Sequence, residues 1–277
     1  MDSQIKTVLI TGSTDGLGKA VAERLANQGW KVLLHGRNPA KGESVLSEMK
    51  QSTGNQDIHY FNADLSSLSD VQRLADEVLA SQEKLDVLIN NAGIGPRAPD
   101  STRTLTDKGH ELFFAVNYLA GYLLARELLP LLKQSSPARV INVASIAQEP
   151  INFDDVMMDN DYSDYRAYSQ SKLAQIIHTN TLTAHHNRSG VTFNSLHPAT
   201  LMSTNMVTNS TALPDSRATV DDGADALERL VISESLSGKS GCYFNEQNDE
   251  QANPQAYDPD AQQRLFEISE NLVNGKG

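Results

Sequence analysis

Short apolar runs alternate with longer amphipathic stretches along most of the chain, and this alternation predicts the fold. The apolar runs, rich in Val, Ile and Leu, read as buried strands at residues 7–11, 30–36, 57–62, 86–91, 139–145 and 191–197. Because they are continuously apolar, these strands should be covered on both faces. Helical periodicity fills the intervals, as in 17–29, which ends on the helix-stopping Gly29, and in 67–82. The pattern predicts an α/β protein, a single Rossmann-type doubly wound parallel sheet with helices on both faces.

The C-terminal part of the chain does not follow this alternation of apolar runs and amphipathic stretches. Residues 245–260 are rich in Asn, Gln and Asp and read as an exposed loop. "GCYF" before them is a candidate last strand, and "AQQRLFEISENLV" after them a candidate closing helix. No linker interrupts the 277 residues, so we expect one domain over 1–277, with a substrate loop at 200–220 and a C-terminal loop and helix at 245–277.

Composition narrows the classes of function. Hydrophobic residues make up 39% and charged residues 21%, which is ordinary for a globular protein with a sizeable core. A net charge of −12 disfavours nucleic-acid partners. No apolar run approaches the ~20 residues that cross a bilayer, so no membrane partner is expected. The N-terminal "MDSQIKTVLITG" resembles neither a secretory signal nor a transit peptide, and we therefore expect a cytoplasmic protein.

Cysteine and histidine usage argues against metal chemistry. The lone Cys242 excludes an internal disulfide and a cysteine-rich zinc site, and the seven histidines lack metal-binding spacing. A small-molecule partner fits best, and association into a homo-oligomer stays open.

A glycine-rich turn, "TGSTDGLG" (11–18), follows the first predicted strand and opens the first helix. Glycine lets the backbone turn sharply and approach a pyrophosphate, whose charge is met by free N–H groups at the helix N-terminus. A purely structural turn is the alternative, but the position at the start of a βαβ unit favours nucleotide binding. The cofactor-binding residues predicted here are Gly12, Ser13, Thr14, Gly16, Leu17 and Gly18.

The end of the second predicted strand bears on which dinucleotide binds. An NAD site usually has an acidic residue about 20 residues beyond the glycines, on the ribose 2′-hydroxyl. Here "HGRNPAKG" places Gly36 and Arg37 at that point, with Lys41 one turn on. Because a guanidinium suits a 2′-phosphate, we expect NADP(H) to be preferred, with NAD(H) as the alternative. The alternative is that Arg37 merely solvates the end of the strand.

"YSDYRAYSQSK" (162–172) sets three tyrosines ahead of a lysine. If the stretch is helical, residues four apart share a face, so only Tyr168 lies beside Lys172. Tyr162 and Tyr165 then read as pocket-wall or packing residues. Taken alone, this spacing also occurs on many ordinary surface helices.

Six motifs occur in an order and spacing that resemble those of the short-chain dehydrogenase/reductase family: "TGSTDGLG", "NADL" (62–65), "NNAG" (90–93), Asn117, Ser145 and "YSQSK" (168–172). The resemblance covers residues 5 to about 205. The TGxxxGxG glycines are similar to those of the compact single-domain branch. The C-terminal "GCYF…LFEISENLV" resembles that of the NADP-dependent retinol-dehydrogenase-like members.

The resemblance implies a role for each matching residue. It implies a catalytic set of Asn117, Ser145, Tyr168 and Lys172. It implies adenine contacts by Asp64 and Leu65, and backbone contacts along the cofactor by Asn91, Ala92 and Gly93. Tyr168, Lys172 and Pro198 complete the implied cofactor contacts, with Lys172 on the nicotinamide ribose.

Carbonyl reduction needs a hydride from the nicotinamide and a proton for the developing alkoxide. Tyrosine can supply that proton, and a nearby cation such as Lys172 should lower its pKa, ordinarily near 10, by ~1–3 units. The Ser145 hydroxyl can hydrogen-bond the carbonyl oxygen. In the family the residue equivalent to Asn117 orders a water in a proton relay, whereas its alternative here is a satisfied core asparagine.

Two departures from the family pattern stand out. Pro198 is followed by Ala199 where Gly is common, which should be tolerated if Ala199 keeps φ below zero. The separation of Ser145 and Tyr168 is also long, as in retinol-dehydrogenase-like members.

Two segments should build the substrate pocket, the insertion 148–161 and the loop 200–214. Their apolar residues are Ile151, Phe153, Val156, Met157, Met158, Leu201, Met202, Met206 and Val207. Neither segment offers a lysine or arginine before Arg217, so we expect a largely apolar carbonyl or alcohol. The alternative is that these side chains only pack the loops onto the core.

The leading hypothesis is therefore an NADPH-preferring oxidoreductase acting on a carbonyl or alcohol. The second is a dinucleotide-binding regulator without turnover, since a fold does not fix a function. A complete set of Asn117, Ser145, Tyr168 and Lys172 favours the enzyme, because a sensor needs no proton donor.

Overall fold

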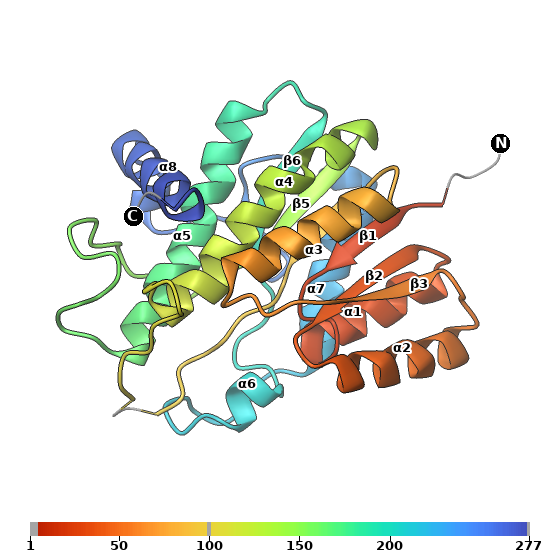
Figure 1. The fold of residues 1–277 in the computed structure, drawn as a ribbon, viewed down its shortest axis with the longest axis horizontal. Helices are drawn as coiled ribbons and strands as arrows, with labels where there is room; N and C mark the ends of the chain where they lie inside the picture. Colours follow the sequence, from red (N-terminus) through yellow and green to blue (C-terminus); the bar gives the residue numbers. More distant parts are fainter. Residues whose placement is uncertain (1–4, 99–100, 276–277) are drawn as a thin grey trace.

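The computed structural model of the protein describes residues 5–98 and 101–275. Its centre is an eight-stranded sheet in the order β3-β2-β1-β4-β5-β6-β7-β8. Figure 1 labels β1, β2, β3, β5 and β6 of this sheet. The strands are β1 (Thr7–Ile10), β2 (Lys31–Gly36), β3 (Ile58–Asn62), β4 (Val87–Asn90), β5 (Ala138–Val143), β6 (Val191–His197), β7 (Tyr243–Asn245) and β8 (Asn248–Glu250). All neighbours pair in parallel except β7 and β8, which are antiparallel.

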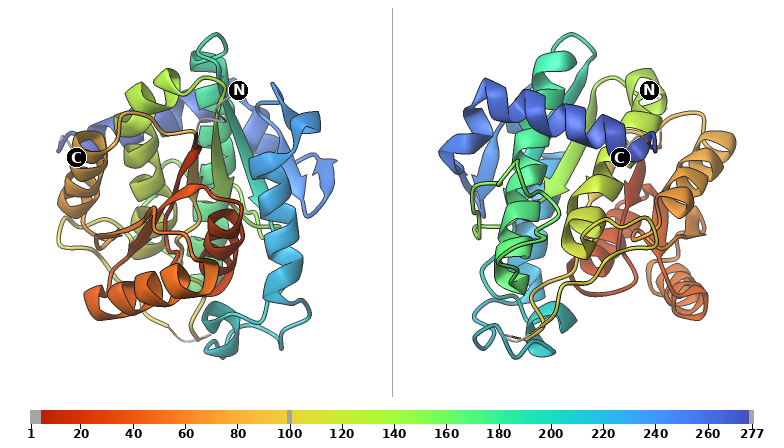
Figure 2. Two further views of the ribbon diagram at one scale, coloured as in Figure 1. Left: turned by 90° about the vertical axis from the view of Figure 1, so that its right-hand side faces the viewer. Right: turned by 60° about the vertical axis from the view of Figure 1, so that its left-hand side comes forward.

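Helices cover both faces of the sheet. One face carries α1 (Gly16–Asn27), α2 (Pro39–Thr53) and α7 (Val220–Ile232). The other carries α3 (Leu68–Ser81), the π-helical segment η1 (Phe114–Leu119), α4 (Ala120–Gln134) and α5 (Asp164–His185). α8 (Pro259–Val273) lies outside α4 and α5 and crosses them (Figure 2). Short elements complete the list: α6 (Asn205–Thr208), η2 (Glu234–Leu236) and η3 (Pro254–Tyr257).

Local sequence fixes where the helices begin. Ser67 and Ser163 cap α3 and α5, each accepting a hydrogen bond from a backbone N–H of the first turn. Asn38 caps α2, and Pro39 occupies its first position. Thr219 and Asp222 form a reciprocal capping box on α7. These caps satisfy N–H groups that the helices cannot bond themselves.

β1 has β2 and β3 on one side and β4 on the other, so the strand order reverses its direction between β1 and β4. In doubly wound sheets, ligands bind at such a switch point, outside the carboxyl ends of the strands. The register aligns Ile10 of β1 with Ile89 of β4, and Ile89 with Ile141 of β5. Residues that follow these strands therefore meet at one edge of the sheet.

The predicted fold class is confirmed, and the six predicted strands agree with β1 to β6 to within one or two residues at each end. "GCYF" contributes to β7, and the closing helix is α8. The expectation of a loop over 245–260 is wrong in part, because β8 and η3 fall within it. β8 is an edge strand whose residues are all exposed, so no apolar pattern marks it.

No described helix is long and apolar enough to cross a membrane. The interpretation of the N-terminus depended partly on residues 1–4, which lie outside the described residues.

Candidate active site

The glycine turn follows β1 and is fixed by a buried histidine on β2. The His35 imidazole accepts a hydrogen bond at Nδ1 from the Gly12 N–H (3.1 Å), so its Nε2–H donates to the Ala63 carbonyl at the end of β3 (3.2 Å). Burial lowers the pKa of His35 to about 4, which keeps the ring neutral at pH 7. Ser13 adds two bonds, from its N–H to the His35 carbonyl (3.0 Å) and from the His35 N–H to its hydroxyl (2.9 Å).

The loop after β4 packs directly against this turn. The Thr11 hydroxyl accepts the N–H groups of Asn91 and Ala92, both at 3.0 Å. The Asn91 amide in turn donates to the Thr11 carbonyl (2.8 Å). Gly12 has φ +67°, and a Cβ there would lie 2.9 Å from the Cα of Ala92, so no larger residue fits.

The first turn of α1 offers free donors beside these glycines. In residues 5–98 and 101–275, no acceptor pairs with the backbone N–H of Leu17 or Gly18. The Gly16 N–H is bonded to the Asp15 carboxylate (2.8 Å), which caps the helix. Two unpaired N–H groups at a helix N-terminus match a pyrophosphate, so the residues here fit a dinucleotide.

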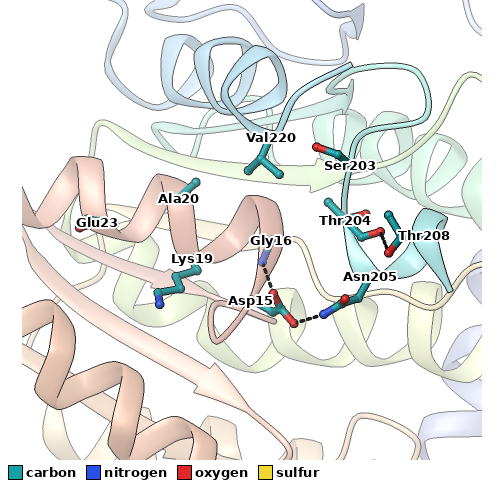
Figure 3. A pocket seen from close by; sticks show the side chains of 10 residues that line it. All are labelled: Asp15, Gly16, Lys19, Ala20, Glu23, Ser203, Thr204, Asn205, Thr208 and Val220. Carbon is teal, nitrogen blue, oxygen red and sulfur yellow. Dashed lines mark hydrogen bonds between the residues drawn. The ribbon is translucent and has the colours of Figure 1, made fainter. Parts of the chain in front are cut away.

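The exposed end of this region holds Asp15, Arg37 and Lys41. Asp15 accepts from Lys41 at 2.6 Å. It also accepts from Asn205 of α6 at 2.6 Å, as Figure 3 shows. The Lys41 ammonium holds the pKa of the Asp15 carboxyl below its usual range. Arg37 is exposed and forms no ion pair within the described residues. Thr14 lies against Gly36, where a Cβ would come within 2.7 Å of it.

Asp64 and Leu65 follow β3 at the same edge of the sheet. Leu65 is buried, and Asp64 is exposed, its carboxylate accepting from the Ser66 N–H (2.9 Å) and hydroxyl (2.8 Å). Both residues directly follow Ala63, whose carbonyl accepts from His35.

Ser145 and Tyr168 come together across the edge of the sheet, from the end of β5 and the second turn of α5. The Ser145 hydroxyl lies near the Tyr168 hydroxyl, where it favours the phenolate. Burial has the larger effect and raises the pKa of Tyr168 above its ordinary value. The expectation of a lowered pKa is therefore wrong for the protein alone, because Lys172 does not point at the hydroxyl.

Lys172 is 3% exposed, and its ammonium donates to the Val143 carbonyl (2.8 Å) and to Oε1 of Gln175 (3.0 Å). The Nζ atom lies 5.7 Å from the centre of the Tyr168 ring, so it faces the ring rather than its oxygen. Burial lowers the pKa of Lys172 to about 7. The same burial that raises the tyrosine pKa thus lowers that of the lysine.

Asn117 sits in the π-helical segment η1, which widens the helix at this point. Its side chain accepts from the Ile94 N–H (2.8 Å) and donates to the Ile94 carbonyl (3.1 Å) and to the Ser171 hydroxyl (2.9 Å). It therefore links the loop after β4 to α5 and has the satisfied bonds of a core asparagine. A Cβ on Gly93 would lie 3.1 Å from its Oδ1 and 3.5 Å from Nζ of Lys172, which brings Gly93 into the same cluster.

Pro198 and Ala199 follow β6 and are buried. Ala199 is not among the described residues with positive φ, so alanine fits where the family usually has glycine. The next loop contacts the glycine turn through Asn205, which donates to the Asp15 carboxylate. It also contacts the loop after β4. There the Ser210 hydroxyl donates to the Pro96 carbonyl (2.6 Å), and the Thr211 N–H donates to the Arg97 carbonyl (2.9 Å).

The apolar residues predicted to line a pocket divide in the structure. Ile151 is 5% exposed and packs with α5 and α8, together with the partly buried Phe153, Val156 and Met157. Met158 is 3% exposed and packs in one cluster with Tyr168. Met202 packs on the α1–α7 side, and Met206 against Gly95. Packing onto the core thus explains most of the insertion. Leu201, with φ +52°, and Val207 are partly exposed in the loop after β6.

Sequence reasoning missed three residues that hold the site together, Thr11, His35 and Gln175. Gln175 had a recognisable signal, because positions 168, 172 and 175 share a helix face and a glutamine on such a buried face needs a partner. His35, inside an apolar strand, was visible in the same way.

These features define a class of protein: a doubly wound α/β fold, with a dinucleotide turn at its switch point and a serine, a tyrosine and a lysine beside it, typical of nicotinamide-dependent oxidoreductases.

Comparison with known proteins specifies the family. The family model described as short chain dehydrogenase matches residues 6–214. The human protein named Retinol dehydrogenase 13 is 34% identical over 97% of this chain and 84% of its own length. A crystal structure of a protein from Mycobacterium paratuberculosis has a TM-score of 0.78 at 29% identity, covering 97% of this chain and 93% of that one. A short chain dehydrogenase from Escherichia coli CFT073, complexed with NADPH, has a TM-score of 0.72 at 26% identity, covering 88% and 97%.

The chain belongs to the short-chain dehydrogenase/reductase family, and it is an oxidoreductase acting on CH–OH donors.

Proposed function

We propose that the protein is an NADPH-preferring oxidoreductase that transfers a hydride between the nicotinamide and a carbonyl or alcohol, with Tyr168 as general acid and base. One observation carries the proposal: the side chains of Ser145 and Tyr168 lie near each other at the edge of the sheet that also holds the glycine turn, with Lys172 over the tyrosine ring.

Each side chain then has a distinct task. The bound nicotinamide supplies or accepts the hydride. In the reducing direction, the Tyr168 hydroxyl donates its proton to the oxygen that becomes the alcohol, while the Ser145 hydroxyl orients that oxygen. Lys172, when protonated, stabilises the tyrosinate that remains, and it would also hold the ribose of a bound cofactor. Asn117 fixes the loop after β4 relative to α5 and so sets the spacing between that loop and Lys172.

Cofactor preference is assigned to Arg37. It is exposed at the end of β2 beside Gly36, and no described carboxylate neutralises it. Lys41, by contrast, is paired with Asp15. The NADPH complex of the related Escherichia coli protein supports the same preference, and NAD(H) remains the alternative cofactor.

The substrate is proposed to be a medium-sized, largely apolar carbonyl or alcohol. Ile146 (53% exposed) follows Ser145, and Tyr165 (56% exposed) precedes Tyr168 by one turn, so both offer apolar surface at the site. Nearby cations are already paired: Arg97 with Asp164, and Arg166 with Glu149. Retinol, in the name of the human relative, is an alcohol of this apolar kind.

The test follows NADPH absorbance with hydrophobic ketones and aldehydes and with keto acids of similar size. We expect turnover, a higher kcat/KM for the hydrophobic set, and a lower kcat/KM with NADH than with NADPH. An advantage for keto acids would discard the apolar pocket. NADPH binding without turnover of any carbonyl or alcohol would favour the alternative function, a dinucleotide-binding regulator.

A single domain over 1–277 and a cytoplasmic location remain part of the proposal. One sheet includes β7 and β8, which supports the first, and the net charge of −12 supports a protein without nucleic-acid partners.

A further inference from the structure

Among residues 5–98 and 101–275, only neutral groups bond the Lys172 ammonium. It has three N–H donors, of which one bonds the Val143 carbonyl at 2.8 Å and a second bonds Oε1 of Gln175 at 3.0 Å. Gly93 lies close to the Lys172 Nζ atom, since a Cβ built on this glycine would be 3.5 Å from Nζ. The third N–H of Lys172 is therefore available on the side of the loop after β4, along which the cofactor is proposed to run.

The titratable groups facing Lys172 add no negative charge at neutral pH. Tyr168 on α5 has a raised pKa and is protonated, and His197 at the end of β6 is neutral because burial lowers its pKa to about 4. The neighbours from β5, η1 and the loop after β4 are the Val143 carbonyl, Asn117 and Gly93, which do not titrate. A buried cation without a counter-ion depends on dipoles for its stabilisation.

Gln175 lies one turn after Lys172, is 3% exposed, and sits on a helix segment that is fastened to the sheet. The Asn142 amide donates to the Thr179 hydroxyl (2.9 Å), which donates to the Gln175 carbonyl (2.9 Å). The Asn90 amide donates to Asn142 (2.8 Å). This chain of bonds fixes the Gln175 backbone relative to β4 and β5, so that its side chain presents Oε1 at a defined point.

We propose that Gln175 is a positioning residue for the reaction: its neutral Oε1 anchors the Lys172 ammonium so that the free N–H faces the cofactor side, without adding a charge beside Tyr168. The inference rests on the proposed function, because it gives Lys172 the task of stabilising the tyrosinate. A glutamate would anchor the lysine equally well but would add a counter-ion, and a methionine would fill the space without anchoring.

The first test measures the lysine itself, without substrate or cofactor. Lysine labelled with ¹³C at Cε is titrated by NMR in the wild type and in Gln175→Glu, with Lys172→Met to assign the signal. A carboxylate partner favours the charged lysine, so the Lys172 titration should move at least ~1 unit to higher pH in Gln175→Glu. A titration that stays within about 0.2 units of the wild type would overturn the inference.

The second test separates positioning from packing. Gln175→Met should lower kcat about tenfold, by the usual effect of losing a hydrogen bond to a charged group, with KM for the carbonyl little changed. Gln170→Met is the matched control, since Gln170 is a buried glutamine on the same helix with no bond to Lys172. Equal kcat losses in the two variants would contradict the role assigned to Gln175.

Gln175→Glu should also move the alkaline limb of the kcat profile to higher pH, because the lysine keeps its proton longer. If the wild type reduced no carbonyl but bound NADPH, the proposed function would fail, while the NMR titration would still decide whether Gln175 controls Lys172. If Gln175→Glu did not fold, Gln175→Asn replaces it. The shorter amide should release the ammonium and lower kcat as Gln175→Met does, and unchanged kcat in Gln175→Asn and Gln175→Met would overturn the inference.

Discussion

The two ends of the proposed cofactor cleft hold lysines in opposite environments. Lys172 is 3% exposed and donates to two neutral acceptors, whereas the Lys41 side chain is 46% exposed and paired with Asp15 at 2.6 Å. Burial lowers the pKa of Lys172 to about 7. At the other end, the Lys41 ammonium lowers the pKa of Asp15, and solvent surrounds the pair.

The difference teaches where single substitutions should matter. Water and salt screen charges at the exposed end, so a pair there contributes little, typically ~0–1 kcal/mol. At the buried end, a charge or a hydroxyl has few alternative partners, and its removal changes protonation and positioning together. The following predictions test this contrast, from the largest effect to the smallest.

Tyr168→Phe should lose most turnover, because general acid–base catalysis contributes ~10²–10⁴-fold. The fold and NADPH affinity should be retained, as measured by circular dichroism and by NADPH fluorescence. Tyr165→Phe is the control, one turn away and 56% exposed, and it should change kcat little. Equal losses in the two variants would show that the wrong tyrosine was assigned.

Lys172→Met should stabilise the fold while it removes activity. Lysine ordinarily titrates near 10.5, and the folded value is about 7, so between these pH values the unfolded chain binds more protons and stability rises with pH. The wild type thus carries the full cost of burying the ammonium below pH 7. After the loss of two hydrogen bonds, we expect a net gain of about 2 kcal/mol in the unfolding free energy at pH 6.

Denaturant unfolding of Lys172→Met and wild type at pH 6, 8 and 10 measures this. The gain in Lys172→Met should fall by about 1.4 kcal/mol per pH unit above pH 7 and should reverse before pH 10, since the wild-type lysine loses its proton in this window. A difference that did not depend on pH would mean that the folded lysine titrates at its ordinary value.

Arg37→Asp should reverse the cofactor preference toward NADH. The change removes a charge-assisted contact with the 2′-phosphate and adds repulsion, for an expected effect of roughly tenfold or more on the ratio of kcat/KM values. Kinetics with both nicotinamides, in wild type and variant, decide it. A wild type that already prefers NADH would sink the assignment of Arg37.

Asp15→Asn is expected to have the smallest effect. The amide keeps a bond to Asn205 or to the Gly16 N–H but loses the charge that pairs with Lys41, so the unfolding free energy should fall by ~1 kcal/mol or less. Raising the salt concentration should reduce even this difference. A loss of several kcal/mol would show that the exposed end is not screened, and the contrast between the two ends would fail.

Much of the fold and of the candidate site could be predicted from local patterns. Continuous apolar runs marked β1 to β6, because strands covered on both faces bury most of their side chains and therefore favour apolar residues. The glycine turn was predictable because Gly12, with φ +67°, must approach Ala92 closely. β8 was not predicted because its three residues are exposed on an edge strand, where no burial imposes an apolar pattern.

The sequence by itself determined the order of the elements and which residues reach the active edge, since strand ends, caps and helix periodicity are local properties. Only the tertiary structure decided the protonation state of those residues and their hydrogen-bond partners. Whether Lys172 lowers the pKa of Tyr168 depends on where Nζ points, and the carbonyl of Val143, from a strand 29 positions earlier, draws it away from the hydroxyl. Burial and long-range partners determine the pKa values of these side chains, and the spacing of a motif predicts neither of them.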